Sequence, residues 1–327
     1  MPIVRYNATN FPTAYHPGLA GSHSLSFTWA ELVWSAISVG RAELLHLFRY
    51  GPFSAFEMVY RAAILYANLN QTNANRLRRS SAYDGLDPSE KSAISYFMGL
   101  TLSKLFADKL LDVPWLMHLD VYRAQLDPAL LAGSSRPDLV GQNSSGQWIA
   151  IESKGRTNDF DQAALSRAKE QVESLSTIGG VAPTLRIALL AYFDEGRLAC
   201  AVDDPDEHDK RDFKEIPDIP LTREKLIEGY YRPFREWVRE APNIEIEEIN
   251  NRRYRVGYMP EVDVSIGIED ELLVETAAEA PQGLRRREST ENEYQAPDGL
   301  LVRVGELWSE TNMRQEPQER RRLALGT

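Results

Sequence analysis

The sequence predicts an α/β fold whose core runs in the order helix, three strands, helix, two strands. Three observations lead to this prediction. A helix-start signal at residues 87–90 precedes an apolar-periodic run, two short apolar runs flank a polar turn at residues 142–146, and residues 185–193 form a buried-strand run. We expect this core to span residues 85–205, between a helical N-terminal region and an α+β C-terminal extension.

The composition of the chain is that of an ordinary globular protein. Of its 327 residues, 43% are hydrophobic and 26% are charged, and no apolar run approaches the length that crosses a bilayer. The N-terminus lacks the basic and apolar segments of a secretory signal. The single cysteine, Cys200, excludes an internal disulfide and sits among apolar residues, which favours a packing role. These features predict a cytoplasmic protein without a membrane partner.

The net charge of −11 disfavours a protein that coats itself in nucleic acid, because phosphate binding draws on clustered Lys and Arg. It does not exclude an enzyme with a local basic groove. Short arginine runs, such as residues 285–287 and 320–322, more often form solvated surface. The low overall basicity indicates that a protein partner or a second copy of the chain completes any nucleic-acid groove.

Residues 1–84 are predicted to be mostly helical. Two runs, at residues 27–50 and 53–69, carry apolar side chains at near-helical spacing. Aromatic stripes of this kind form core more often than base-stacking surfaces. The polar and basic segment at residues 68–81 is interpreted as a loop or helix end that leads to the core.

The first core helix is predicted to begin at Pro88 and to run to residue 111. Asp87 is the expected N-cap, and Pro88 takes the first helical position. Glu90 has the spacing of a capping-box residue, whose carboxylate bonds back to the amide of the N-cap. A strand is expected at residues 115–123, after Pro114.

Residues 136–154 are predicted to form a hairpin with charged side chains at its open end. Because a tight turn pairs the strand ends furthest from it, Asp138 should lie beside Glu152. Strand side chains alternate between faces, so Lys154 points the same way as Glu152, and Ser153 points the other way. Two carboxylates and an ammonium in one place favour a cation between the acids. This geometry indicates a hard divalent metal.

A second core helix is expected at residues 159–177, and the following glycine pair ends it. Lys169 and Gln171 flank its apolar face on opposite sides. Residues 185–193 then form a buried strand, and a further strand follows a short turn.

The residues Pro137-Asp138 and Glu152-Ser153-Lys154 resemble the two halves of the motif of the PD-(D/E)xK nuclease superfamily. The resemblance covers residues 85–205 and implies a restriction-endonuclease-like core. The predicted succession of elements is the one that such a core requires, with the acids and the lysine on its second and third strands. The flanking segments indicate no particular family within the superfamily.

The resemblance implies a metal-dependent nuclease that hydrolyses phosphodiester bonds of nucleic acid, first of all DNA, in a setting such as bacterial restriction or phage defence. Asp138, Glu152 and the main-chain carbonyl of Ser153 would hold Mg²⁺ or Mn²⁺, because oxygen ligands without a His/Cys set favour these ions over zinc. Lys154 would orient or help deprotonate the attacking water and stabilise the charge on phosphorus.

Several alternatives stay open from the sequence. Superfamily members often bind the metal with a glutamate from the helix before the sheet, so Glu90 is a metal candidate as well as a capping residue. Gln171, or Lys169, is the residue of the second helix expected to steady the site or a phosphate. The protein can also be a nuclease-like binding or assembly subunit without turnover, or a nuclease that acts on RNA or on nucleotides.

The part of the chain after the core divides into two predicted regions. Residues 206–275 are expected to form the α+β extension, with an amphipathic helix at 222–238 and three short strands within 244–268. Residues 276–327 shift in composition toward Ala, Pro, Gly, Glu and Arg, with a brief recovery at residues 300–308. They are predicted to be a polar, partly disordered tail, whose end at residues 312–327 is disordered or needs a partner.

Overall fold

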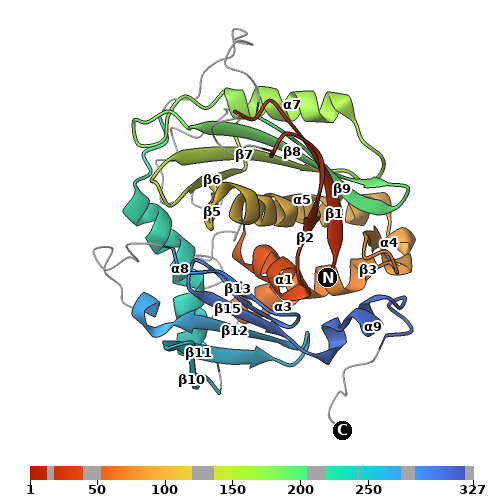
Figure 1. Cartoon of the computed structure of the whole chain (residues 1–327), viewed down its shortest axis with the longest axis vertical. Helices are drawn as coiled ribbons and strands as arrows, with labels where there is room; N and C mark the ends of the chain where they lie inside the picture. Colours follow the sequence, from red (N-terminus) through yellow and green to blue (C-terminus); the bar gives the residue numbers. More distant parts are fainter. Residues whose placement is uncertain are drawn as a thin grey trace.

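The structure is a computed structural model, and it describes residues 1–12, 18–39, 53–119, 136–204, 218–241, 243–273 and 284–320. It shows a mixed α/β fold in which two β-sheets lie on either side of a group of helices (Figure 1). In this part of the chain, none of the helices combines the length and the apolar character that a membrane span requires.

The first sheet contains nine described strands, and its main path has the order β2-β1-β9-β8-β7-β6-β5. Strands β7 and β8 run parallel, as do β1 and β9, and the other neighbours on this path are antiparallel. The strands are β1 (Ile3–Thr9), β2 (Gly21–Ser26), β3 (Leu69–Gln71), β4 (Leu77–Arg79), β5 (Trp115–His118), β6 (Leu139–Gln142), β7 (Trp148–Gly155), β8 (Leu185–Asp194) and β9 (Arg197–Asp203).

Helices cover both faces of the first sheet (Figure 1). Helix α7 (Gln162–Glu173) buries Leu165 and Ala168 against β8. Helix α5 (Pro88–Leu111) crosses the other face of β7 at very short range. Gly155 permits this crossing, because any Cβ at that position would overlap the carbonyl of Ser95.

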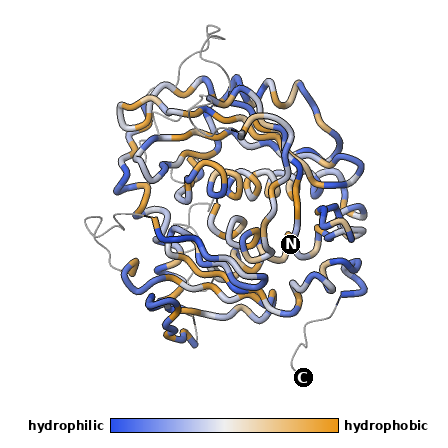
Figure 2. Tube along the Cα trace, in the orientation of Figure 1, coloured by the Kyte–Doolittle hydropathy of each residue, from blue (hydrophilic) through white to orange (hydrophobic). Residues whose placement is uncertain are grey.

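The second sheet has the order β10-β11-β12-β15-β14-β13, and all its strand pairs are antiparallel. Helices α1 (Trp29–Ser38) and α3 (Phe53–Asn68) lie between this sheet and α5, and α8 (Arg223–Glu240) runs down one side (Figure 1). Figure 2 shows hydrophobic segments along α5 and the strands of the first sheet, which together form much of the core.

The remaining described elements are short. The strands of the second sheet are β10 (Glu245–Ile249), β11 (Arg252–Met259), β12 (Val264–Glu269), β13 (Glu288–Ser289), β14 (Glu293–Gln295) and β15 (Leu300–Val304). Short helices are α4 (Ser81–Gly85), α9 (Glu310–Met313) and the 3-10 turns η2 (Asp270–Leu273) and η4 (Glu306–Trp308).

The predicted order of elements in the core is confirmed. Helix α5 is followed by β5, β6 and β7, then by α7, and then by β8 and β9. The predicted helix at 222–238 is α8, and the three strands predicted within 244–268 are β10, β11 and β12. The expected strand at 115–123 is seen as β5, and its part beyond residue 119 lies outside the described residues. Residues 40–50 of the first helical run predicted in the N-terminal region also lie outside the described residues.

The prediction that residues 1–84 are mostly helical is wrong at the N-terminus. Residues 3–9 and 21–26 are strands β1 and β2, and β1 pairs with β9 so that Arg5 lies opposite Ala199. The burial of β1 alternates, with Val4 and Tyr6 inside and Arg5 outside. This period of two is a strand signal. Residues 1–84 therefore combine helices with strands that extend the sheet of the core.

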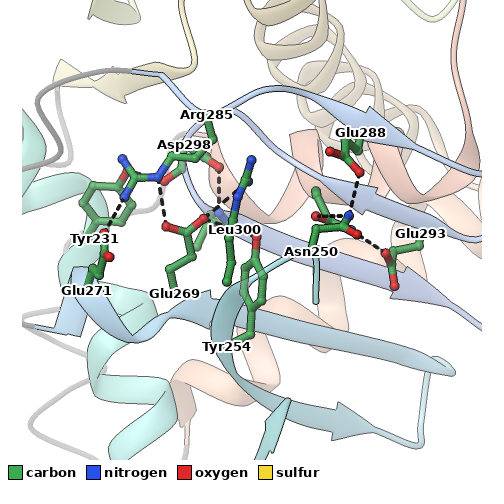
Figure 3. A network of polar contacts seen from close by, with 12 residues as sticks. Tyr231, Asn250, Tyr254, Glu269, Glu271, Arg285, Glu288, Glu293, Asp298 and Leu300 are labelled. Atoms are coloured by element: carbon green, nitrogen blue, oxygen red, sulfur yellow. Dashed lines mark hydrogen bonds and ion pairs between the residues drawn. The ribbon is translucent and has the colours of Figure 1, made fainter. Parts of the chain in front are cut away.

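The predicted polar tail forms ordered structure over residues 284–320, so the disorder expected at residues 312–327 is wrong for residues 312–320. Strand β15 pairs with β12 through the centre of the second sheet. Arg285 Nε donates to Glu269 Oε2 at 2.9 Å, and Asn250 Nδ2 donates to Glu288 Oε2 at 2.6 Å (Figure 3). The charged residues that suggested a solvated tail are therefore paired with residues of the extension. Residues 276–283 and 321–327 lie outside the described residues.

A buried polar network joins this C-terminal segment to the helices. The carboxylate oxygen Oδ2 of Asp298 accepts hydrogen bonds from Trp34 Nε1 at 3.1 Å and from Tyr230 OH at 2.6 Å. The ammonium of Lys104 donates to Tyr230 OH at 3.0 Å, and burial lowers the pKa of Lys104 to about 8. Asp298 and Lys104 are fully buried. Burial of their charges would destabilise the fold without these hydrogen-bond partners.

Replacement of Asp298 should therefore weaken the whole fold. We expect Asp298→Ala to lower the free energy of unfolding by about 3 kcal/mol, because several buried donors lose their acceptor. Asp298→Asn should cost less, since it keeps one acceptor oxygen. Urea unfolding of the full chain measures both values. Glu291→Ala removes an exposed acid from the same segment and should stay within about 0.5 kcal/mol of the parent; a similar loss for Glu291→Ala and Asp298→Ala would contradict the assigned role.

Candidate active site

The hairpin of β6 and β7 brings the two predicted acids together. Its turn is fixed by Asn143 Oδ1, which accepts from the amides of Ser145 and Gln147. In the resulting register Leu139 lies opposite Ile151, so Asp138, one residue earlier, faces Glu152. The local sequence determines this arrangement. A short turn fixes the register of the two strands, and the register determines which residues face each other at the open end of the hairpin.

Each acid is held by a backbone amide of the opposite strand. The amide of Asp138 donates to Glu152 Oε2 at 3.0 Å, and the amide of Ser153 donates to Asp138 Oδ2 at 3.0 Å. The side chain of Glu152 is fully buried, and that of Asp138 is 16% exposed. The two carboxylates are therefore fixed relative to each other at the end of the first sheet.

Lys154 and Gln171 complete this cluster. The ammonium of Lys154 forms an ion pair with Glu152 Oε1 and donates to Gln171 Oε1 at 3.1 Å. The amide nitrogen Nε2 of Gln171 donates to the carbonyl of Arg136 at 2.7 Å, just before Asp138. The hydroxyl of Ser153 instead contacts Ser103 on α5, at 3.1 Å. The predicted alternation of side chains along β7 is thus confirmed.

Burial raises the pKa of both acids. For Glu152 burial is the largest effect, the carboxylate of Asp138 adds to it, and Lys154 opposes it, so that the pKa rises to about 8. Burial also raises the pKa of Asp138, against the stabilising amide of Ser153 and the charge of Lys154. Near neutral pH the pair therefore retains a proton, which a bound cation would displace.

The donor set matches a hard cation. Among the described residues, no three His, Cys, Asp or Glu side chains are grouped closely enough to hold an ion by themselves. Two carboxylates are nevertheless sufficient for Mg²⁺, which keeps several water ligands. The amide of Ser153 faces Asp138, and the carbonyl of a strand residue points to the same side as its amide. Asp138, Glu152 and this carbonyl are therefore suitable oxygen ligands for Mg²⁺ or Mn²⁺.

The structure places Glu90 and Lys169 in other roles. Glu90 is exposed at the start of α5, and its Oε2 accepts from the amide of Asp87 at 3.2 Å, which is the capping interaction. Lys169 pairs with Asp203 on β9 at 2.7 Å. Since Ala188 lies between Glu152 and Asp203 in the strand register, Lys169 serves an acid two strands away from Glu152. From α7, Gln171 contacts the cluster.

Two further residues at the cluster are missed by the sequence analysis. Tyr96 on α5 forms a hydrogen bond with His118 Nε2 at 2.8 Å, and this nitrogen lies 3.9 Å from Asp138 Oδ1. Burial, followed by the charges of Arg61 and Arg136, lowers the pKa of His118 to about 4, so its ring is neutral at neutral pH. The predicted strand at 115–123 could have indicated His118. When β5 pairs with β6, His118 lies opposite Leu139, the residue that directly follows Asp138.

No protein-family model matches the chain, and no curated protein or solved structure matches it either. The geometry of the site is therefore the basis for its interpretation.

The raised pKa of Glu152 predicts how stability depends on pH without metal. Between pH 4.5, the ordinary value, and about 8, the folded state holds a proton that the unfolded state has lost. This contribution to stability is therefore complete below pH 4.5 and disappears as the pH rises to about 8. We expect the Tm of the parent protein in EDTA to fall more steeply over this range than that of Glu152→Gln.

Thermal unfolding at several pH values checks this prediction. Glu228→Gln, on the exposed face of α8, is the matched control and should follow the parent curve. Equal slopes for the parent protein and Glu152→Gln would show that Glu152 ionises normally.

Proposed function

We propose that this protein is a metal-dependent nuclease with a restriction-endonuclease-like core of the PD-(D/E)xK type. The single observation that carries the proposal is the joining of Asp138 and Glu152, through reciprocal amide hydrogen bonds, beside the ammonium of Lys154. The confirmed order of elements adds support, because it sets one acid before β6 and the other acid with the lysine on β7.

The residues of the cluster have separate roles in phosphodiester hydrolysis. Asp138, Glu152 and the Ser153 carbonyl would hold Mg²⁺ or Mn²⁺, and the bound ion would supply Lewis-acid polarisation of the phosphate and a more acidic water. Lys154 orients that water and stabilises the negative charge that develops on the phosphate oxygens. Gln171 steadies the ammonium of Lys154 through the bond to its Oε1.

The electrostatics of the cluster favour an enzyme over a binding subunit without turnover. Glu152 is fully buried and its pKa is raised to about 8, so the acid pair destabilises the metal-free fold at neutral pH. Replacement of buried charges by apolar residues is often neutral or stabilising. Strongly perturbed acids that are retained beside a lysine are characteristic of catalytic sites.

We propose DNA as the substrate and a bacterial restriction or phage-defence setting on the basis of the superfamily resemblance. The net charge of −11 supports a second copy or a protein partner that completes the nucleic-acid groove. The proposal places the protein in the cytoplasm, in keeping with its single, buried cysteine.

A cleavage assay with labelled DNA, RNA and nucleotides, in Mg²⁺, Mn²⁺ or EDTA, tests the function. We expect metal-dependent cleavage of DNA, and a loss of about 10²-fold or more in Asp138→Asn and in Lys154→Met, because each removes charge needed in the transition state. The matched controls are Asp159→Asn and Lys225→Met, which change exposed residues and should keep full activity.

Three outcomes of this assay would contradict parts of the proposal. Cleavage of RNA or nucleotides but not of DNA would show that DNA is not the substrate. Absence of cleavage with every metal would favour a nuclease-like binding subunit without turnover. Full activity of Asp138→Asn and Lys154→Met would remove this cluster from the mechanism.

Metal binding should depend on pH in a way that the raised pKa of Glu152 determines. Deprotonation of Glu152 must precede metal binding, so we expect Mn²⁺ affinity to rise roughly tenfold per pH unit below the pKa and to level off above it. The pKa of about 8 places the change in slope near that pH. Isothermal titration with Mn²⁺ in buffers of different ionisation enthalpy measures both the affinity and the released proton.

Glu152→Gln is the control for this titration. It should bind Mn²⁺ weakly and with a much smaller pH dependence, since the titrating group is absent. A parent protein whose Mn²⁺ affinity is constant from pH 6 to 8 would argue against metal binding by Glu152.

A further inference from the structure

A second site lies away from the acid pair, where the start of α3 meets the second sheet. A pocket of about 690 Å³ is lined there by Phe56 and Val59 of α3 and by residues of β10, β11 and the turn that follows β11. It shares no lining residue with the cluster around Asp138 and Glu152. The C-terminal extension thus contributes a surface that the proposed nuclease reaction does not use.

Aromatic rings form the apolar wall of this pocket. The side chain of Phe56 is 57% exposed, and that of Tyr258 is 56% exposed. The hydroxyl of Tyr258 donates to Asp263 Oδ1 at 2.9 Å, which fixes the ring and leaves its face available. Val59 adds aliphatic surface one helical turn from Phe56. Large apolar side chains exposed next to one another commonly mark a binding surface.

Carboxylates form the rest of the lining. Glu245 and Glu247 alternate on β10, so they point to the same face of the sheet, and Glu261 follows β11. Glu247 is neutralised by Arg303 at 2.7 Å. Glu245 and Glu261 are exposed, and neither forms an ion pair with another described residue. Within the described part of the chain, the pocket therefore presents two negative charges without an ion-pair partner beside aromatic faces.

We propose that this pocket binds a lysine- or arginine-bearing segment of a partner protein. The cation lies against the face of Tyr258 and between Glu245 and Glu261, where ring and carboxylates attract it. The aliphatic stem of the same side chain, and an apolar neighbour, cover Phe56 and Val59. The two carboxylates repel phosphate, so a nucleic acid is the wrong occupant for this surface.

The experiment measures binding of a fluorescein-labelled eight-residue peptide of alternating Lys and Leu to the full-length chain, with the Arg-Leu version in parallel. We expect binding of at least one of these peptides, weakened tenfold or more by the double substitution Glu245→Gln with Glu261→Gln, and by Tyr258→Ala. The matched control is Glu248→Gln, an exposed acid of the same strand whose side chain alternates to the other face. Its affinity should stay within twofold of the parent.

Each other result overturns the proposal. Equal weakening by Glu248→Gln would indicate attraction to overall negative charge. Equal binding of a Lys-Leu peptide whose lysines are acetylated would indicate an apolar groove. Spermidine that binds as tightly as the peptides would identify a small polyamine site. Self-association of the parent chain that the double variant loses would identify a second copy as the occupant. Failure of both peptides to bind, with circular dichroism showing folded protein, would exclude the proposed partner chemistry.

Discussion

The arrangement of the candidate site depends on two reciprocal hydrogen bonds at the open end of one hairpin. The amide of Asp138 holds the carboxylate of Glu152, and the amide of Ser153 holds the carboxylate of Asp138. These bonds use backbone amides that lie just beyond the ladder of β6 and β7, where a strand would otherwise leave them unpaired. The same two bonds therefore satisfy the strand end and fix the acids, which links the stability of the hairpin to the geometry of the site.

The surrounding helices complete what the hairpin begins. Helix α7 supplies Gln171, which bridges Lys154 to the strand segment before Asp138. Helix α5 approaches the other face closely because Gly155 has no side chain, and it brings Tyr96 to His118. The cluster is consequently sequestered from water on several sides, which is why burial dominates the raised pKa of Glu152.

What the sequence predicts well is local. The acid pair follows from one short turn and its register, and the start of α5 follows from its capping residues, since both are set by neighbours in the chain. The pairing of β1 with β9 sets Arg5 opposite Ala199, which is far away in the sequence. No local sequence pattern specifies so distant a strand partner. The charged segment at residues 284–320 resembles a solvated tail until its partners, such as Glu269 for Arg285, are known. The role of Glu90 could not be predicted from sequence spacing alone, because a capping residue and a metal ligand would be a glutamate at the same position. The folded structure distinguishes the two roles, and Glu90 forms the capping hydrogen bond.

The two sites proposed for this chain need opposite electrostatic surroundings, and the two sheets provide them separately. The proposed phosphodiester hydrolysis would need a cation and the ammonium of Lys154, whereas the pocket at Tyr258 would present Glu245 and Glu261 to the proposed basic partner. Close proximity of the two would set the carboxylates of the pocket against the phosphate backbone. Placing the acidic pocket on the second sheet, and the acid pair on the first, avoids this repulsion without any change in the net charge of −11. The buried contacts of Asp298 with Trp34 of α1 and Tyr230 of α8 then anchor the segment before β15 to the helices, and α1 in turn packs against α5 of the core.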